Sequence, residues 1–146
     1  MYDIHGDGLA TQIVDLIADI LEESDVEMQV RFEDLTAEPG ELPRLMVSPI
    51  KDNNESKSYI SGEAIVPFPF ALYFRQTAFD EQDRLDAHQF LTQVTEQLLE
   101  RLVVLDGYVA YRKPSASVPF RLGATEAFED WQVTFDLTYK QQRRKA

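Results

Sequence analysis

The clearest pattern in the chain is a regular alternation of apolar and polar residues near its C-terminal end. Within the segment 128–139, apolar residues occupy every second position from 131 onward, namely Trp131, Val133, Phe135, Leu137 and Tyr139. Side chains of a strand point alternately to its two faces, so the pattern predicts one strand with an apolar and a polar face. Aromatic and β-branched residues also pack well on a pleated sheet. The segment therefore predicts a strand that closes a small β-containing domain.

Two other segments show the three- and four-residue spacing of amphipathic helices. In the first, 9–23, the apolar stripe comprises Leu9, Ile13, Leu16, Ile17 and Ile20, and Asp7 is the expected N-cap. The second begins after Asp80, a good N-cap, and is expected to run to about Leu105, where Asp106 and Gly107 end it. Seven apolar residues share one face of this long helix: Ala87, Phe90, Leu91, Val94, Leu98, Leu102 and Leu105.

Shorter alternating or apolar segments predict further strands over 26–32, 44–48, 59–66, 71–76 and 108–111. Pro67 and Pro69 should interrupt the ladder, because proline cannot donate a backbone hydrogen bond. The segments 36–43, 51–58 and 113–123 are expected to be loops or connections.

The expected strands are grouped and do not alternate with helices. This order predicts an α+β fold: a mainly antiparallel β-sheet packed against an N-terminal helix and one long central helix. We expect a single domain over residues 1–139, followed by a basic, flexible tail over 140–146.

Composition narrows the functional classes. The 146 residues include 26 acidic and 14 basic ones, which gives a formal net charge of -12 and disfavours binding to nucleic acid. There are no cysteines, which excludes disulfides and thiolate metal sites. The N-terminus lacks a basic signal-peptide region, and no apolar run reaches the roughly 20 residues that span a bilayer. We expect a soluble protein that is made in the cytosol and has no membrane partner.

Candidate chemistry is sparse. His5 and His88 are the only histidines, they lack a partner at ligand spacing, and His88 is expected to be a packed or surface residue. The acidic residues Asp80, Glu81, Asp83 and Asp86 could form a cation site, but acids also gather where the helix dipole is positive, which is the interpretation we favour. A Ser-His-Asp arrangement stays open, although no G-x-S-x-G elbow is present. We predict no catalytic residue, no cofactor and no metal site.

A dense run of aromatic residues surrounds the two prolines. It comprises Phe68, Phe70, Tyr73, Phe74 and Phe79, and one strand face cannot bury all of them. We expect about half to lie in the core and the rest to form an intersubunit contact, since aromatics are enriched in interface cores. The candidate assembly surface combines Phe68 and Phe70 with the polar loop residues Lys51, Asp52, Asn53 and Asn54 and the tail residues Arg143, Arg144 and Lys145.

The order of elements resembles a known family, the small tail-terminator and minor capsid (head-tail joining) proteins of long-tailed bacteriophages. The similarity lies in the opening helix over 9–23, the strands around the polar loop 51–58, the strand with Leu72, Tyr73, Phe74 and Arg75, the capped helix from Asp80 and the closing alternating strand. The resemblance implies a non-enzymatic protein that forms a hexameric ring at the head-proximal end of the tail tube. Its partners would be further copies of itself, the tail tube protein and a head-completion or connector protein, with DNA only passing through the lumen.

The same resemblance implies a location at the tail-head junction of the virion, and in the host cytoplasm during assembly. The acidic charge would then keep DNA from adhering to the lumen wall. Two alternatives stay open: a small non-enzymatic adaptor or chaperone-like module that binds a peptide in a groove, and an enzyme that uses carboxylates or His88 in a cleft.

Overall fold

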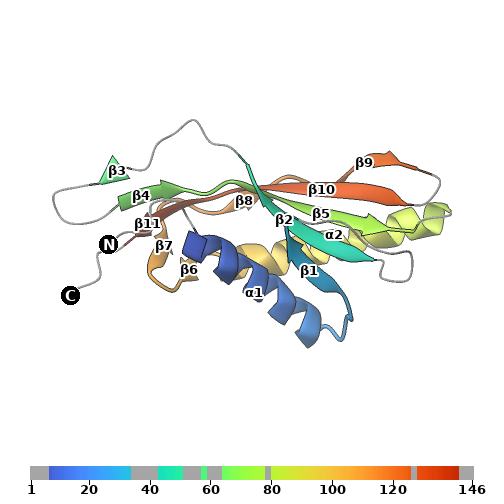
Figure 1. Cartoon of the computed structure of the whole chain (residues 1–146), viewed down its shortest axis with the longest axis horizontal. Helices are drawn as coiled ribbons and strands as arrows, with labels where there is room; N and C mark the ends of the chain where they lie inside the picture. The colour runs from blue at the N-terminus through green and yellow to red at the C-terminus, as the bar shows by residue number, and fades with distance from the viewer. Residues whose placement is uncertain are drawn as a thin grey trace.

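The computed structural model describes residues 7–33, 43–50, 57–58, 64–77, 80–125 and 128–141. Within these residues the chain forms two helices and eleven strands, and the strands belong to two sheets (Figure 1). The helices are α1 (Asp7–Glu23) and α2 (Glu81–Arg101). This confirms the predicted α+β fold class.

The larger sheet, called sheet A, has the strand order β1-β2-β5-β10-β8, and β9 also pairs with β10. Every pair in sheet A is antiparallel except the parallel pair β1–β2. Its strands are β1 (Gln29–Phe32), β2 (Arg44–Pro49), β5 (Phe70–Gln76), β8 (Ser115–Ala116), β9 (Phe120–Ala124) and β10 (Glu129–Asp136). The predicted strand over 71–76 is β5, and it lies in the middle of sheet A.

The smaller sheet, called sheet B, has the order β3-β4-β11-β7-β6, and all its pairs are antiparallel. Its strands are β3 (Lys57–Ser58), β4 (Ala64–Pro67), β6 (Val104–Leu105), β7 (Tyr108–Ala110) and β11 (Thr138–Gln141). The last strand extends to Gln141, two residues beyond the boundary predicted at 139.

Two segments of the chain pass from one sheet into the other at the same level. The first leaves β4 at Pro67 and enters β5 at Phe70, so the prolines do interrupt the ladder. The second leaves β10 at Asp136 and enters β11 at Thr138, so the segment predicted as one strand is in fact two. The Phe68 amide donates to the Leu137 carbonyl at 2.9 Å, which ties the two crossings together.

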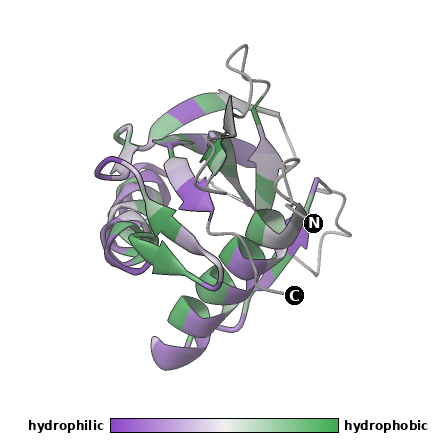
Figure 2. Cartoon of the chain, turned by 90° about the vertical axis from the view of Figure 1, so that its left-hand side faces the viewer, coloured by the Kyte–Doolittle hydropathy of each residue, from purple (hydrophilic) through white to green (hydrophobic). Residues whose placement is uncertain are grey.

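Figure 1 shows both helices on one side of the long strands, and the core lies between these layers. Apolar and polar bands alternate along α1, and its apolar side is buried (Figure 2). The five alternating apolar residues of the closing segment are also buried, which confirms their predicted orientation: Trp131, Val133, Phe135, Leu137 and Tyr139.

The start of α2 matches the prediction and its end does not. Asp80 caps the helix, since its Oδ1 accepts a hydrogen bond from the Asp83 amide at 2.9 Å. The helix ends at Arg101, four residues early, because the chain turns at once into the hairpin β6–β7. Asp106 and Gly107 form the turn of this hairpin, and Gly107 has a φ of 81°, which glycine adopts without strain.

A buried hydroxyl fixes the point where α2 ends. The Tyr139 hydroxyl donates to the carbonyl of Leu102 at 2.7 Å, and burial raises the pKa of Tyr139. One of the last carbonyls of the helix is thereby satisfied.

Other local predictions fall partly outside the described residues. The predicted loop 36–43 lies outside them except for Pro43, and so do residues 51–56 and 59–63. Lys57 and Ser58, expected in a loop, form β3 and pair with β4. The predicted connection 113–123 was wrong in type, because it contains β8 and most of β9.

Candidate interaction surface

The structure corrects the aromatic part of the predicted assembly surface. Phe68 is only 7% exposed and Phe70 is fully buried, so neither side chain is available to a partner in this fold. Both lie where the chain crosses between the sheets, and the ring of Phe70 stacks on that of Phe135 with centroids 4.6 Å apart. Phe68 lies against Phe70 with centroids 6.3 Å apart. The two rings therefore belong to the core.

The remaining residues of that predicted surface are not described by the structure. Lys51, Asp52, Asn53 and Asn54 fall in the undescribed range 51–56, and Arg143, Arg144 and Lys145 fall in 142–146. Their role in assembly stays a prediction.

The structure instead places large exposed apolar side chains on an edge of sheet A that the sequence reading missed. All five residues of β9 are exposed, and within the described residues β9 pairs only with β10. Phe120 and Leu122 lie on β9, and Val118, which is 75% exposed, precedes it. The alternation of Val118, Phe120 and Leu122 was the signal that could have revealed this strand.

Exposed apolar residues also occur on the opposite edge of sheet A and on one edge of sheet B. Phe32 is exposed on β1, which within the described residues pairs only with β2. Four more lie on or beside the hairpin β6–β7 of sheet B: Val103, Val104, Val109 and Tyr111. Natural proteins usually protect the edges of their sheets, so apolar edges mark contact surfaces.

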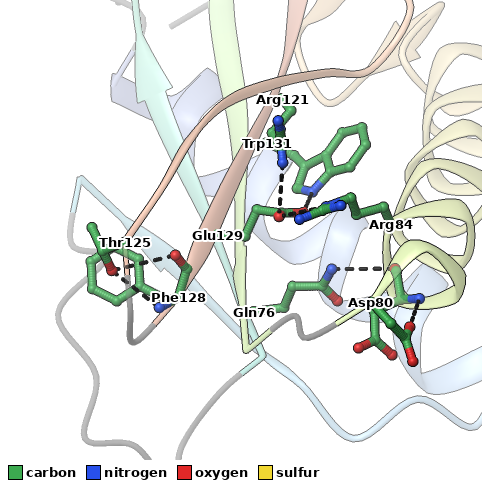
Figure 3. A network of polar contacts seen from close by, with 9 residues as sticks. Gln76, Asp80, Arg84, Arg121, Thr125, Phe128, Glu129 and Trp131 are labelled. Atoms are coloured by element: carbon green, nitrogen blue, oxygen red, sulfur yellow. Dashed lines mark hydrogen bonds and ion pairs between the residues drawn. The ribbon is translucent and has the colours of Figure 1, made fainter.

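An ion-pair network around one buried carboxylate holds β9 in place (Figure 3). Glu129 of β10 is only 2% exposed and accepts hydrogen bonds from three groups: Arg84 Nε at 3.1 Å, Arg121 Nη1 at 3.3 Å and Trp131 Nε1 at 3.0 Å. Arg84 comes from α2 and Arg121 from β9, so one carboxylate joins the helix, the central strand and the edge strand.

The negative charge of Glu129 is stabilised by the groups around it. Burial alone would raise the pKa of Glu129, but the hydrogen bonds from Arg84, Trp131 and Arg121 outweigh it and hold the pKa below its usual value. The carboxylate is therefore ionised at neutral pH. Its three hydrogen-bond donors come from α2, β9 and β10 and tie these elements together, so we interpret this network as structural.

A second ion pair lies close by, where β9 and β10 meet. Arg75 of β5 contacts both carboxylate oxygens of Asp130, with Nε 2.8 Å from Oδ1 and Nη2 3.0 Å from Oδ2. The guanidinium also lies 3.8 Å from the centroid of the Phe128 ring. This bidentate contact holds the start of β10 against β5.

A shallow groove runs beside α1 at the β1 edge. It has a volume of about 350 Å³ and is lined by Ala10, Thr11, Val14, Asp15 and Phe32. Among the described residues that line it, Ala10, Val14 and Phe32 are apolar and Asp15 is charged. The groove can accept apolar side chains from a partner.

Chemistry is limited in the part of the chain that the structure covers. No group of three or more His, Cys, Asp or Glu residues there is placed to hold a metal ion. Of the four acids at the start of α2, Asp80 serves as the helix cap and Asp86 accepts a hydrogen bond from Gln82. His88 is exposed and lies edge-on to Trp131. No described helix is long and apolar enough to cross a membrane.

In comparisons with known proteins, the chain matches no protein-family model and no curated protein.

Proposed function

We propose that the protein is a structural phage protein that forms a ring at the head-proximal end of the tail tube, ends tail growth and joins tail to head. Its partners are further copies of itself, in a homo-oligomer for which six copies are expected, and the tail tube and head-completion proteins. DNA passes through the lumen without being bound, and the ring belongs to the tail-head junction of the virion.

The observation that carries the proposal is the edge strand β9. It is exposed along its whole length, bears Phe120 and Leu122, and is held to the domain by the Arg121–Glu129 ion pair. An anchored, apolar edge suits a permanent contact with another protein. A protein that works through such edges is structural in character.

The arrangement of elements supports the same proposal. The opening helix, the central strand with Leu72 and Phe74, the helix capped by Asp80 and the closing alternating segment all occur in the order on which the phage resemblance rests. The net charge of -12 also suits a lumen that repels passing DNA.

An adaptor or chaperone-like module is the second candidate, and the groove beside α1 favours it. Ala10, Val14 and Phe32 give that groove an apolar lining of the kind that receives side chains of a bound peptide. In this case the protein would act as a monomer or dimer and its partner would be a peptide segment.

Negative-stain electron microscopy distinguishes the two. The purified protein is imaged alone and with tail tubes assembled from the tube protein encoded near its gene. Caps at one tube end, or free rings, are expected, and the variant Phe120→Asp should lose them while staying folded. Particles that never bind a tube end contradict the terminator proposal and leave the adaptor as the working idea.

A further inference from the structure

We propose that the protein associates head to tail through the two opposite edges of sheet A, with β9 of one copy pairing antiparallel with β1 of the next. The partner is thus a second copy of this chain. The inference deepens the proposed function and rests on it only for the claim that the row of copies closes into a ring at a tail tube.

The first support is that the two edges lie at opposite ends of one sheet. In the described residues, β1 pairs only with β2 and β9 only with β10, and the order between them is β1-β2-β5-β10-β9. Two different patches that bind each other form a heterologous contact, which generates a ring when the rotation closes.

The second support is the direction of the strands. β1 runs parallel to β2, and each further step through β5 and β10 to β9 reverses direction, so β1 and β9 run opposite ways. When a second copy continues the sheet in the same orientation, its β1 therefore meets β9 as an antiparallel neighbour.

The third support is that the two edge strands lie at the same height along the strand direction of sheet A. One row of paired residues crosses the whole sheet from edge to edge: Gln29, Arg44, Arg75, Asp130 and Gly123. The four-residue β1 and the five-residue β9 thus face the same level of the sheet. A second copy can pair without a shift along the strands, which favours a closed ring over a climbing filament.

The fourth support is charge. The segment 112–124, which carries β8 and β9, holds the basic residues Arg112, Lys113 and Arg121 and no acidic residue, so its formal charge is +3 in a chain of net charge -12. Arg112 contacts Asp136 and Arg121 contacts Glu129, so this edge keeps an excess of positive charge that is smaller than the count for the segment alone. The segment 25–33, which carries β1, holds three acidic residues and one basic residue, so its formal charge is -2. Opposite charges at the two edges favour β9 meeting β1 and disfavour either edge meeting itself.

Apolar side chains complete the match. Val118, Phe120 and Leu122 are exposed at the β9 edge, and Phe32 is exposed at the β1 edge beside the groove along α1. Pairing would cover these side chains and provide hydrogen-bond partners for the outer backbone groups of both strands.

The test uses two charge-reversed variants of the full chain. Glu27→Lys with Glu33→Lys makes the β1 edge basic like the β9 edge, and Arg112→Glu with Lys113→Glu makes the β9 edge acidic like the β1 edge; all four residues are exposed. Arg121 is left unchanged because it holds Glu129. Sedimentation velocity over a concentration series at low salt measures association, and circular dichroism verifies that each variant is folded.

We expect the unmodified chain to associate, and each variant alone to associate about 10-fold or more weakly, because its two edges now repel. An equal mixture of the two variants should associate again, since every β9–β1 contact in an alternating row then joins opposite charges. The control Glu96→Lys with Glu100→Lys makes the same charge change on the exposed side of α2 and should associate like the unmodified chain. Added salt should weaken association.

Three results would overturn the inference: an unmodified chain that stays monomeric up to about 1 mM, a mixture that stays monomeric, or loss of association in only one variant, which indicates one edge pairing with itself. Other results distinguish the proposed phage function from the proposed contact between copies. Rescue in the mixture without binding to tube ends rejects the phage role and keeps the head-to-tail contact. Caps on tube ends that survive both variants keep the phage role and reject this contact.

Discussion

Removing the ring of Phe70 tests whether the aromatic run beside the prolines belongs to the core or to an interface. Phe70 is fully buried and stacks on Phe135 with an angle of 3° between the rings. Phe70→Ala loses a transfer term of about 1.5–3 kcal/mol for a buried side chain of this size. The lost stacking adds about 0.5–1.5 kcal/mol, and the cavity left behind brings the total to about 3–5 kcal/mol.

The assay is urea unfolding followed by far-UV circular dichroism, with Phe120→Ala as the matched control. Phe120 is the same residue type on the exposed strand β9, so its removal should change the free energy of unfolding by only about 0.5–1 kcal/mol. A loss of about 3–5 kcal/mol lowers the melting temperature by roughly 6–20 °C in a domain of this size.

Self-association provides the second measurement. Phe120→Ala should weaken it, whereas Phe70→Ala should leave it intact under conditions where the variant is still folded. The reasoning is refuted if Phe70→Ala costs less than about 1 kcal/mol with an unchanged urea dependence of the unfolding free energy. Loss of association in the folded Phe70→Ala variant would instead restore the original interface interpretation.

Two further predictions concern the polar groups that anchor the helices and the edge strand. The pKa of Glu129 is lowered in the folded state, so the stability that it contributes is present above its unfolded pKa of about 4.3 and is lost as the pH falls through the lower folded pKa. Glu129→Gln should therefore reduce the free energy of unfolding at pH 7 by about 1–3 kcal/mol and flatten its fall at acid pH in urea titrations; an unchanged acid profile would contradict this. Asp80→Ala should cost about 1 kcal/mol through loss of the α2 cap, whereas the exposed Glu96→Ala should cost less than about 0.5 kcal/mol; equal losses in urea unfolding would show that the cap bond contributes nothing.

Local rules predicted the parts of this fold that local chemistry decides. Asp80 was recognisable as a cap because its side chain bonds to an amide only three residues ahead. The alternation from Trp131 to Tyr139 was recognisable because burial of one face is a property of the strand itself.

The errors occur where distant partners decide the structure. The apolar stripe of α2 continues through Leu102 and Leu105, but pairing of 104–105 with 108–109 draws those residues into a hairpin. Phe68 and Phe70 fall in an aromatic run that one strand face could not bury, yet the crossing between two sheets buries both. β9 has only five residues, and its place at an edge depends on its pairing with β10.

The sequence also could not locate the candidate surface. β9 lies at an edge because, within the described residues, it has a neighbouring strand on one side only. That position depends on the order of all the strands in sheet A. Only the apolar alternation of Val118, Phe120 and Leu122 could be recognised from the sequence alone.

The central pairing of sheet A has a consequence for how the protein folds during synthesis. β5 ends at Gln76, but its partner β10 begins only at Glu129, and the two pair along seven residues. The middle of the sheet therefore cannot form until β10 has left the ribosome, and until then the buried face of β5 lacks its main neighbour. Phe70, Leu72 and Phe74 therefore stay incompletely covered while α2 and the β6–β7 hairpin are synthesised. A chain shortened before β10 should accordingly aggregate and not form a smaller folded domain.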